Sequence, residues 1–160
     1  MTRTPKPCTY TITLRELTMN KFYKIKKNSN AKKETAWRYF AKYIKLRDAI
    51  KSTGDVFYAK CITCGDLKPI EEMDAGHGIP GRMNSILFNE DIVNAQCQNC
   101  NRYGGGELQM YKRILIDIHG QEKWDYWQST KNTNVKYTDL DFEQIAKIYR
   151  QKVKDLKVYI

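Results

Sequence analysis

The fold of this chain is decided by residues 61–102, which read CITCGDLKPIEEMDAGHGIPGRMNSILFNEDIVNAQCQNCNR. The stretch opens with one Cys-x-x-Cys pair, Cys61 and Cys64, and closes with another, Cys97 and Cys100. A Cys-x-x-Cys turn brings two thiolates onto one side of a tight loop, and two such turns complete the tetrahedral sulfur coordination of zinc. We therefore expect one structural zinc ion, with an insert between the knuckles that is longer than in a minimal zinc ribbon.

The cysteine count favours metal binding over a disulfide framework. Four of the five cysteines lie in the two pairs, which is typical of a zinc site in a reducing compartment. Two disulfides are the alternative, and Cys8 is left over as a bystander thiol. The N-terminal segment lacks the apolar core of a signal peptide, and no apolar run reaches the length of a membrane span. We expect a cytoplasmic protein without a membrane partner.

Positive charge is concentrated before the cysteine module. Residues 1–60 hold 15 Lys and Arg against 4 Asp and Glu, a net charge of +11, whereas residues 61–160 hold 13 against 14, a net charge of −1. Such a segment predicts a polyanionic partner, most simply nucleic acid. A merely solubilising, disordered basic tail is the alternative for residues 20–33.

The chain has two histidines, and His77 is the better candidate for catalysis. It lies between the knuckles in D-A-G-H-G-I-P, where the flanking glycines let a substrate backbone approach closely. Phosphodiester hydrolysis needs a base that deprotonates water, and a neutral imidazole can serve. A structural role is the alternative for His77. His119 lies at the end of an expected helix beside Gly120, where a capping or solvent-exposed role is the default.

Three side chains near His77 offer oxygen ligands for a catalytic Mg²⁺ or Mn²⁺. Asn101 directly follows Cys100, so the zinc fixes its position, and a carboxamide oxygen can hold a hard cation. Asp74 is the nearest preceding carboxylate, but residues i and i+3 of a strand point to opposite faces, so a bulge at Ala75-Gly76 would be needed. Asn94 is the third, either as a ligand or as the side chain that holds the loop around His77.

Hydrophobic periodicity predicts an α+β protein with helices on both sides of the zinc core. The stripe of Trp37, Phe40, Ala41 and Ile44 favours a helix over residues 33–51, with Arg38, Lys42 and Lys45 on another face. That basic face either grips phosphates or is simply solvated. The other expected elements are a strand at Thr9–Leu14, a loosely ordered segment at Lys21–Lys33, short extended segments at 56–59, 70–73, 75–79 and 91–96, a turn at Pro80-Gly81, a loop at 82–90, and a helix opening at the second knuckle.

The C-terminal third is predicted to be helical. One helix should run from Leu108 to about Ile118, and a shorter one should pack Trp124 and Trp127 into the core, base stacking being the minority alternative. After a polar connection at residues 129–136, Thr138 caps an amphipathic helix whose apolar face docks onto the domain or forms a homodimer. The resulting division is a basic, partly flexible arm (1–32), a helix and four-cysteine core (33–128), and a linker with the final helix (129–160).

Several of these motifs together resemble one phage family. C-I-T-C-G, M-D-A-G-H, N-A-Q-C-Q-N-C-N-R, the glycines that follow and Tyr111 resemble the lambdoid phage NinG (Rap) recombination proteins, over roughly Trp37 to Gly120. That family is thought to act on branched DNA as a structure-specific endonuclease. The layout is also similar to the HNH, or ββα-metal, nucleases, including the junction resolvase endonuclease VII. The resemblance implies a treble-clef, ββα-metal core and a phage or prophage protein in the cytoplasm of a bacterial host.

The resemblance also implies a role for each site residue. His77 would be the general base, Asp74 and Asn101 would hold the catalytic metal, and the four cysteines would bind structural zinc. Three features depart from the pattern. HNH motifs usually place an acidic or histidine ligand at the position of Gly76 and often an Asn at that of Ile92, and the phage family usually has an additional cysteine-rich N-terminal segment, of which Cys8 would be a remnant.

Three functions follow from these observations. The first is a metal-dependent DNA endonuclease acting on branched or recombination-intermediate DNA, with Arg38, Lys42, Lys45, Arg82 and Arg102 in contact with the DNA. The second is a zinc-stabilised DNA-binding module without catalysis, for which His77 would be superfluous. The third is a protein–protein adaptor, which would not need the basic N-terminal segment.

Overall fold

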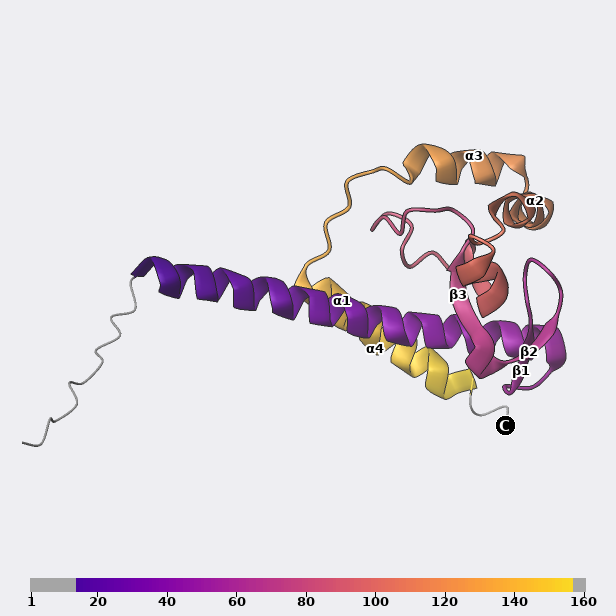
Figure 1. Cartoon of the computed structure of the whole chain (residues 1–160), viewed down its shortest axis with the longest axis horizontal. Coiled ribbons are helices and arrows are strands. Elements are labelled where there is room, and N and C mark those ends of the chain that lie inside the picture. The colour runs from indigo at the N-terminus through magenta and orange to yellow at the C-terminus, as the bar shows by residue number, and fades with distance from the viewer. Residues whose placement is uncertain (1–13, 157–160) are drawn as a thin grey trace, which may run out of the picture.

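The computed structural model describes residues 14–156, with side chains from residue 30 onward, and it is a mixed α+β structure (Figure 1). One long helix, α1 (Leu14–Thr53), runs along the molecule. It is followed by β1 (Tyr58–Lys60), β2 (Leu67–Pro69), β3 (Met73–His77), β4 (Val93–Cys97), α2 (Leu108–His119), α3 (Gln121–Thr130) and α4 (Asp139–Leu156). Single helical turns lie at Ile70–Glu72 and Asn99–Tyr103.

Helix α1 is longer than the sequence pattern predicted. The segment Lys21–Lys33, expected to be loosely ordered, lies within it, which corrects that expectation. The reason is that no glycine or proline occurs between Pro7 and Gly54, so nothing in the sequence breaks the helix. Gly54 then ends it with a φ of +81° and an N–H that bonds to the carbonyl of Ile50 at 2.9 Å. The predicted strand at Thr9–Leu14 lies outside the described residues, apart from Leu14, where α1 begins.

Two small antiparallel sheets frame the zinc knuckles. Strands β1 and β2 pair Ala59 with Lys68 and lead into and out of the first knuckle, while β3 and β4 pair Asp74 with Gln96 and His77 with Val93. Residues 70–73 were expected to be extended, but the chain makes a single 3-10 turn at Ile70–Glu72 before β3 begins. Pro69 permits this turn, because its φ of −55° suits the position before a helical turn.

The three C-terminal helices match the predicted periodicity. Trp124 and Trp127 of α3 are buried, so both belong to the core as expected. Thr138 and Asp141 form a reciprocal cap at the start of α4: the Thr138 N–H donates to Asp141 Oδ2 at 2.7 Å, and the Asp141 N–H donates to Thr138 Oγ1 at 3.3 Å.

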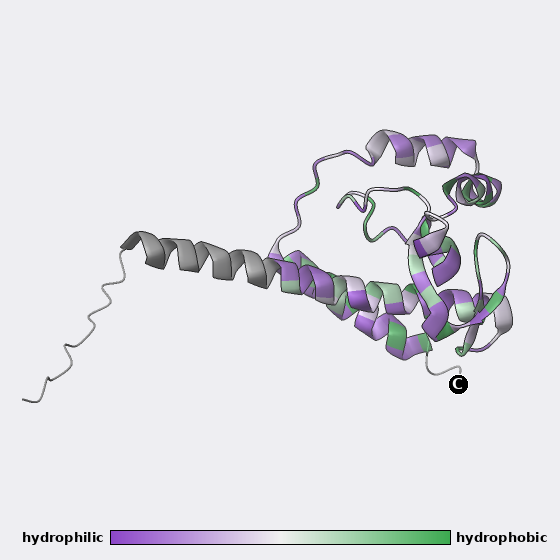
Figure 2. Ribbon diagram, in the orientation of Figure 1, coloured by the Kyte–Doolittle hydropathy of each residue, from purple (hydrophilic) through white to green (hydrophobic). Residues whose placement is uncertain are grey.

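Helix α4 packs along α1, as the first of its two predicted roles requires (Figure 1). Hydrophobic and hydrophilic residues are interspersed along α4, which is typical of an amphipathic helix (Figure 2). Phe142, Tyr149 and Val153 are buried, and Tyr149 meets Phe40 of α1 edge to face with ring centres 4.8 Å apart. A homodimer, the second predicted role, stays a prediction and would have to use another surface.

The main core joins α1 to the loop after β3 and to the C-terminal helices. Its fully buried members include Phe40, Ile44, Ile79, Tyr111 and Leu115. A second cluster packs Ala49 of α1 against the two sheets and the cysteines. The site therefore rests on a rigid frame. Within residues 14–156, every helix is too short or too polar to cross a lipid bilayer.

Candidate active site

The four paired cysteines converge on one point. Their Sγ atoms all lie within 4.8 Å of one another, and the Sγ atoms of Cys64 and Cys97 are 4.0 Å apart. With Zn–S bonds of about 2.3 Å, tetrahedral geometry places the sulfurs about 3.8 Å apart. This cluster can therefore hold a structural metal such as zinc, as the spacing predicted. All four thiols are free, so the disulfide alternative is not adopted. Cys8 lies outside the described residues.

Backbone donors hold the knuckles in place around this cluster. The N–H of Cys97 donates to Cys61 Sγ at 3.3 Å, and that of Cys100 donates to Cys97 Sγ at 3.5 Å. Burial raises the pKa of the Cys61 thiol, but backbone N–H groups and the Thr63 hydroxyl outweigh it and lower that pKa to about 6. Cys61 is thus prepared to act as a thiolate ligand. The second knuckle also positions the next side chains, because Asn101 and Arg102 lie on its helical turn.

His77 is the last residue of strand β3 and is half-buried. Its Nε2 lies 3.2 Å from the carbonyl oxygen of Leu87, and its ring stacks on Trp37 with centres 5.1 Å apart. A carbonyl only accepts, so Nε2 carries the proton and Nδ1 keeps a free lone pair. Burial lowers the pKa of His77 to about 4, against the opposing effect of the Leu87 carbonyl. The imidazole is therefore neutral near pH 7 and can accept a proton.

Asp74 is held by the two residues that follow the last cysteine. Its Oδ2 accepts from Asn101 Nδ2 at 2.9 Å and from Arg102 Nε at 2.8 Å, and its Oδ1 accepts from Arg102 Nη2 at 2.7 Å. Arg102, foremost, lowers the pKa of Asp74, so the carboxylate is ionised. Since Asn101 donates through its nitrogen, its oxygen stays available as a ligand.

Asp74, His77 and Asn101 line one cavity of about 480 Å³, together with Trp37, Lys45 and Arg82. The pairing of β3 with β4 is regular, so the bulge that we expected at Ala75-Gly76 is absent. Among the described strands β3 pairs only with β4, so its other edge is free. A hollow at such an edge can be lined from both faces of a strand, which would allow Asp74 and His77 to line the same cavity.

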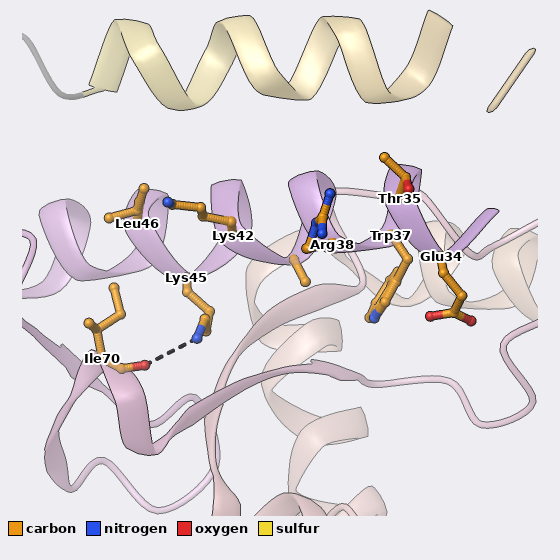
Figure 3. Close-up of a pocket in the computed structure, with 9 residues that line it drawn as sticks. Glu34, Thr35, Trp37, Arg38, Lys42, Lys45, Leu46 and Ile70 are labelled. Atoms are coloured by element: carbon orange, nitrogen blue, oxygen red, sulfur yellow. Dashed lines mark hydrogen bonds between the residues drawn. The ribbon is translucent and has the colours of Figure 1, made fainter. Parts of the chain in front are cut away.

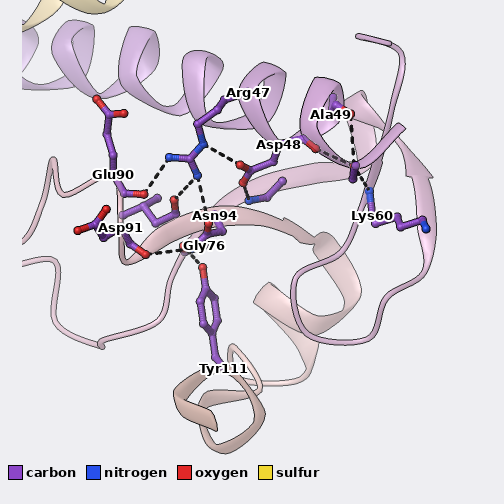
Figure 4. A network of polar contacts seen from close by, with 12 residues as sticks. Arg47, Asp48, Ala49, Lys60, Gly76, Glu90, Asp91, Asn94 and Tyr111 are labelled. Atoms are coloured by element: carbon purple, nitrogen blue, oxygen red, sulfur yellow. Dashed lines mark hydrogen bonds and ion pairs between the residues drawn. The ribbon is translucent and has the colours of Figure 1, made fainter. Parts of the chain in front are cut away.

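Asn94 does not line this cavity. It lies on β4 opposite Gly76, and its side chain accepts from Arg47 Nη2 at 3.1 Å and donates to the carbonyl of Asp91 at 3.5 Å (Figure 4). These contacts set Asn94 apart from the prospective ligands. They suit its other predicted role, in which the side chain holds the loop next to β3.

The sequence reading missed a polar network between α1 and β4 (Figure 4). Arg47 donates to the carbonyls of Glu90 at 2.8 Å and Val93 at 3.1 Å, and it pairs with Asp48 at 2.7 Å. Asp48 Oδ2 in turn accepts from the N–H of Ala95 at 2.6 Å. The available signal was Arg47 itself, a cation three residues after Ile44 on the apolar side of the helix.

The five predicted DNA contacts do not form one free basic face. Arg38 and Lys42 are exposed. Lys45 is half-buried and donates to the carbonyl of Ile70 at 3.2 Å, and burial lowers its pKa. Arg82 lies over the Trp37 ring at 4.4 Å, and Arg102 is paired with Asp74. Lys45 and Arg82 therefore form part of the cavity wall, and Arg102 holds Asp74, which also lines the cavity.

Gly76 and Ile92, the two positions within the insert that depart from the HNH pattern, are both tightly packed. Ile92 is fully buried in the main core. Gly76 lies so close to Gln96 that an added Cβ would stand 2.3 Å from Gln96 Oε1. A ligand side chain at position 76 therefore has no room in this structure. Tyr111 reinforces the segment, because its buried hydroxyl donates to the carbonyl of Gly76 at 2.9 Å.

Comparison with known proteins gives a consistent result. Residues 12–158 match the profile of the family described as NinG, Bacteriophage Lambda NinG protein. Over 98 residues, or 61% of this chain, the chain is 36% identical to Protein ninG of Escherichia phage lambda, covering 47% of that protein. It is 35% identical to Protein ninG of Escherichia phage 933W and 32% identical to that of Salmonella phage P22, covering 48% and 47% of them.

The matched region thus spans about half the length of these curated relatives. No solved structure matches the chain significantly. The resemblance to the NinG family that was inferred from the cysteine pairs and the D-A-G-H segment is confirmed.

Proposed function

The chain belongs to the NinG family, and on that premise we propose that it is a divalent-metal-dependent DNA endonuclease that hydrolyses phosphodiester bonds in branched or recombination-intermediate DNA. In this proposal the cysteine cluster holds structural zinc within a treble-clef, ββα-metal core of the HNH type. Strands β3 and β4 are the two strands, and the turn at Asn99–Tyr103 opens the helical part.

The state of His77 is the observation that carries the proposal. Its Nε2–H is donated to the carbonyl of Leu87, so Nδ1 keeps the free lone pair through which an imidazole can take a proton from water. The stack on Trp37 fixes the plane of the ring. A purely structural histidine would not need to line a cavity that also contains a carboxylate, a carboxamide and several cations.

The residues present fit a hard divalent cation. Asp74 supplies an ionised carboxylate and Asn101 a free amide oxygen, which are the donor types that Mg²⁺ and Mn²⁺ prefer. When bound, such an ion stabilises the negative charge that develops on the phosphate and on the leaving oxygen. Arg82 and Lys45 add positive charge to the lining of the same cavity, Arg102 is paired with Asp74 beside it, and Arg38 and Lys42 extend the positive charge along α1. Polyanionic DNA would be drawn to this face.

The test is cleavage of labelled four-way-junction DNA and of linear duplex DNA with Mg²⁺ or Mn²⁺. We expect the wild type to cut the junction, and His77→Ala to be inactive while still folded and loaded with zinc. His119→Ala is the matched control, because it removes the other histidine, and it should retain activity. Equal cleavage by wild type and His77→Ala would refute His77 as the base.

A zinc-stabilised DNA-binding protein without catalysis is the second candidate. The observation that favours it is that Arg102 and Asn101 already occupy both carboxylate oxygens of Asp74. In addition, close packing at Gly76 leaves no room for the usual neighbouring ligand. If no DNA is cut with either metal, yet junction DNA binds in a salt-dependent way, this second function replaces the first.

A further inference from the structure

We propose that an apolar groove on α1, which adjoins the His77 cavity, binds an unpaired DNA strand next to the bond that is cut. This inference rests on the proposed nuclease function and specifies its substrate: DNA in which a single strand leaves the duplex at the cleavage site. The residues of the groove come from one face of α1 and from Ile70 (Figure 3).

The groove is a separate hollow of about 660 Å³ that shares a wall with the His77 cavity. Trp37, Ala41 and Lys45 line both hollows, so the two adjoin along α1. Ala41 has the smallest side chain of these three shared residues. A strand that places a phosphate near His77 can therefore continue along α1 without leaving the surface.

The lining has the two properties that an unpaired strand requires. Trp37, Ala41, Leu46 and Ile70 provide an apolar surface, on which the faces of unstacked bases can lie. Arg38, Lys42 and Lys45 provide cations, against a single acidic side chain, Glu34. Arg38 and Lys42 are exposed and one helical turn apart, so both can meet successive phosphates of one strand.

A blunt duplex fits this surface less well. Its bases are stacked and paired inside the helix, so only phosphates and groove edges reach a protein surface, and the apolar lining would gain no contact. An unpaired strand offers phosphates and base faces together. The lining residues shared with the His77 cavity favour the substrate itself as the occupant over an acidic, amphipathic protein segment.

The experiment measures binding in the absence of cleavage. The zinc-loaded His77→Ala protein, without added divalent metal, is titrated into three fluorescent DNAs of equal length: a blunt duplex, a forked duplex with two unpaired arms, and a single strand. We expect the forked DNA to bind about tenfold more tightly than the blunt duplex, since each stacked base contributes strongly.

Ala41→Trp in the same background places a large side chain where the two hollows adjoin and should reduce the affinity ratio of forked to blunt DNA to about one. Ala41→Leu should give a smaller loss, which separates blockage from misfolding, and zinc content and circular dichroism verify the fold. Lys147→Glu, an exposed change on α4, is the charge control and should affect all three DNAs far less than Lys42→Glu.

The outcomes separate this inference from the nuclease proposal. Equal affinity for forked and blunt DNA, or unchanged forked binding by Ala41→Trp, overturns the groove assignment even if the wild type cleaves DNA. Preferential, Ala41-dependent binding of forked DNA supports the groove even if the wild type cleaves nothing. If Ala41→Trp leaves DNA binding intact but abolishes binding of an acidic peptide, the groove is a protein-docking site and the inference is wrong.

Discussion

Arg102 binds the carboxylate of Asp74 in a bidentate manner: its Nε lies 2.8 Å from Oδ2 and its Nη2 lies 2.7 Å from Oδ1. The same carboxylate is the strongest prospective ligand for a divalent cation in the cavity of His77. Arg102 is half-exposed, with 54% of its side-chain surface accessible, so it can leave this position without disturbing the core. If the proposed divalent cation binds at Asp74, Arg102 would compete with it for the carboxylate.

Arg102→Gln should strengthen the binding of Mn²⁺. An ion pair this exposed contributes little free energy, so we expect the affinity to rise by only about two- to fivefold. Isothermal titration of the zinc-loaded protein measures it. Arg113→Gln, on the exposed side of α2, is the matched control and should leave the affinity unchanged. A lower affinity in Arg102→Gln would mean that Asp74 serves Arg102 alone.

Zinc content should follow the paired cysteines. Cys97→Ser removes a buried ligand and should lose the metal together with the native fold, because zinc binding contributes directly to folding in sites of this kind. Cys8→Ser should retain about one zinc per chain. Elemental analysis and thermal unfolding check both variants. Zinc retained by Cys97→Ser, or lost from Cys8→Ser, would contradict the four-cysteine assignment.

Local patterns predicted the zinc cluster and most elements. Each Cys-x-x-Cys turn brings its two sulfurs together locally, so the metal site is predictable from the spacing alone. The apolar stripe through Trp37, Phe40 and Ile44 is strong enough to identify the helix. The prediction that Lys21–Lys33 is loosely ordered was wrong, because a basic, polar composition does not prevent a helix where no glycine or proline interrupts it.

The cavity itself could not be read from the sequence. Asp74 and His77 line the same cavity, although strand periodicity places them on opposite faces. The ion pair of Arg102 with Asp74 joins residues 28 positions apart, and Arg47 reaches Val93 across 46 positions. Such contacts depend on tertiary packing, which a single sequence does not reveal.

The pKa of His77 should be measurable by NMR titration. We expect about 4, because burial disfavours the imidazolium. The unfolded chain takes up this proton near pH 6.5 and the native protein only near pH 4, so the free energy of unfolding should fall as the pH drops through that window. The titration is made in the His119→Ala background, which leaves one histidine signal. Trp37→Ala should raise the pKa of His77 by exposing its ring to water. An unchanged pKa would show that burial by Trp37 does not cause the lowered value.

Arg47 should be essential for the placement of β4. Arg47→Met leaves the carbonyls of Glu90 and Val93 without this donor and Asp48 without its cation, which should cost about 2–4 kcal/mol. Chemical unfolding of the zinc-loaded protein measures the change. Arg38→Met, an exposed change on the same helix, should stay within about 0.5 kcal/mol of the wild type. Similar values for the two variants would show that the network adds no stability.

Gly76 and Gln96 should be energetically coupled across the two strands. A methyl group at position 76 would stand 2.3 Å from Gln96 Oε1, so Gly76→Ala should destabilise the protein by about 1–3 kcal/mol. Gln96→Ala should also be costly, because Gln96 Nε2 donates to the carbonyl of Gly106 at 2.8 Å. The double variant should nevertheless lose about 1 kcal/mol less free energy of unfolding than the two single variants together, because the side chain that clashes with the new methyl group is then absent.

The control for this cycle combines Gly76→Ala with Gln98→Ala. Gln98 also follows β4 closely, but its side chain donates to the carbonyl of Glu71 at 3.1 Å, so its effect should simply add to that of Gly76→Ala. Additive losses for Gly76 and Gln96 would show that the strands separate to admit a side chain. Coupled losses would instead explain why an acidic ligand cannot precede His77 here. In that case the proposed catalytic cation would depend on Asp74 and Asn101, and its affinity should not increase in Gly76→Asp.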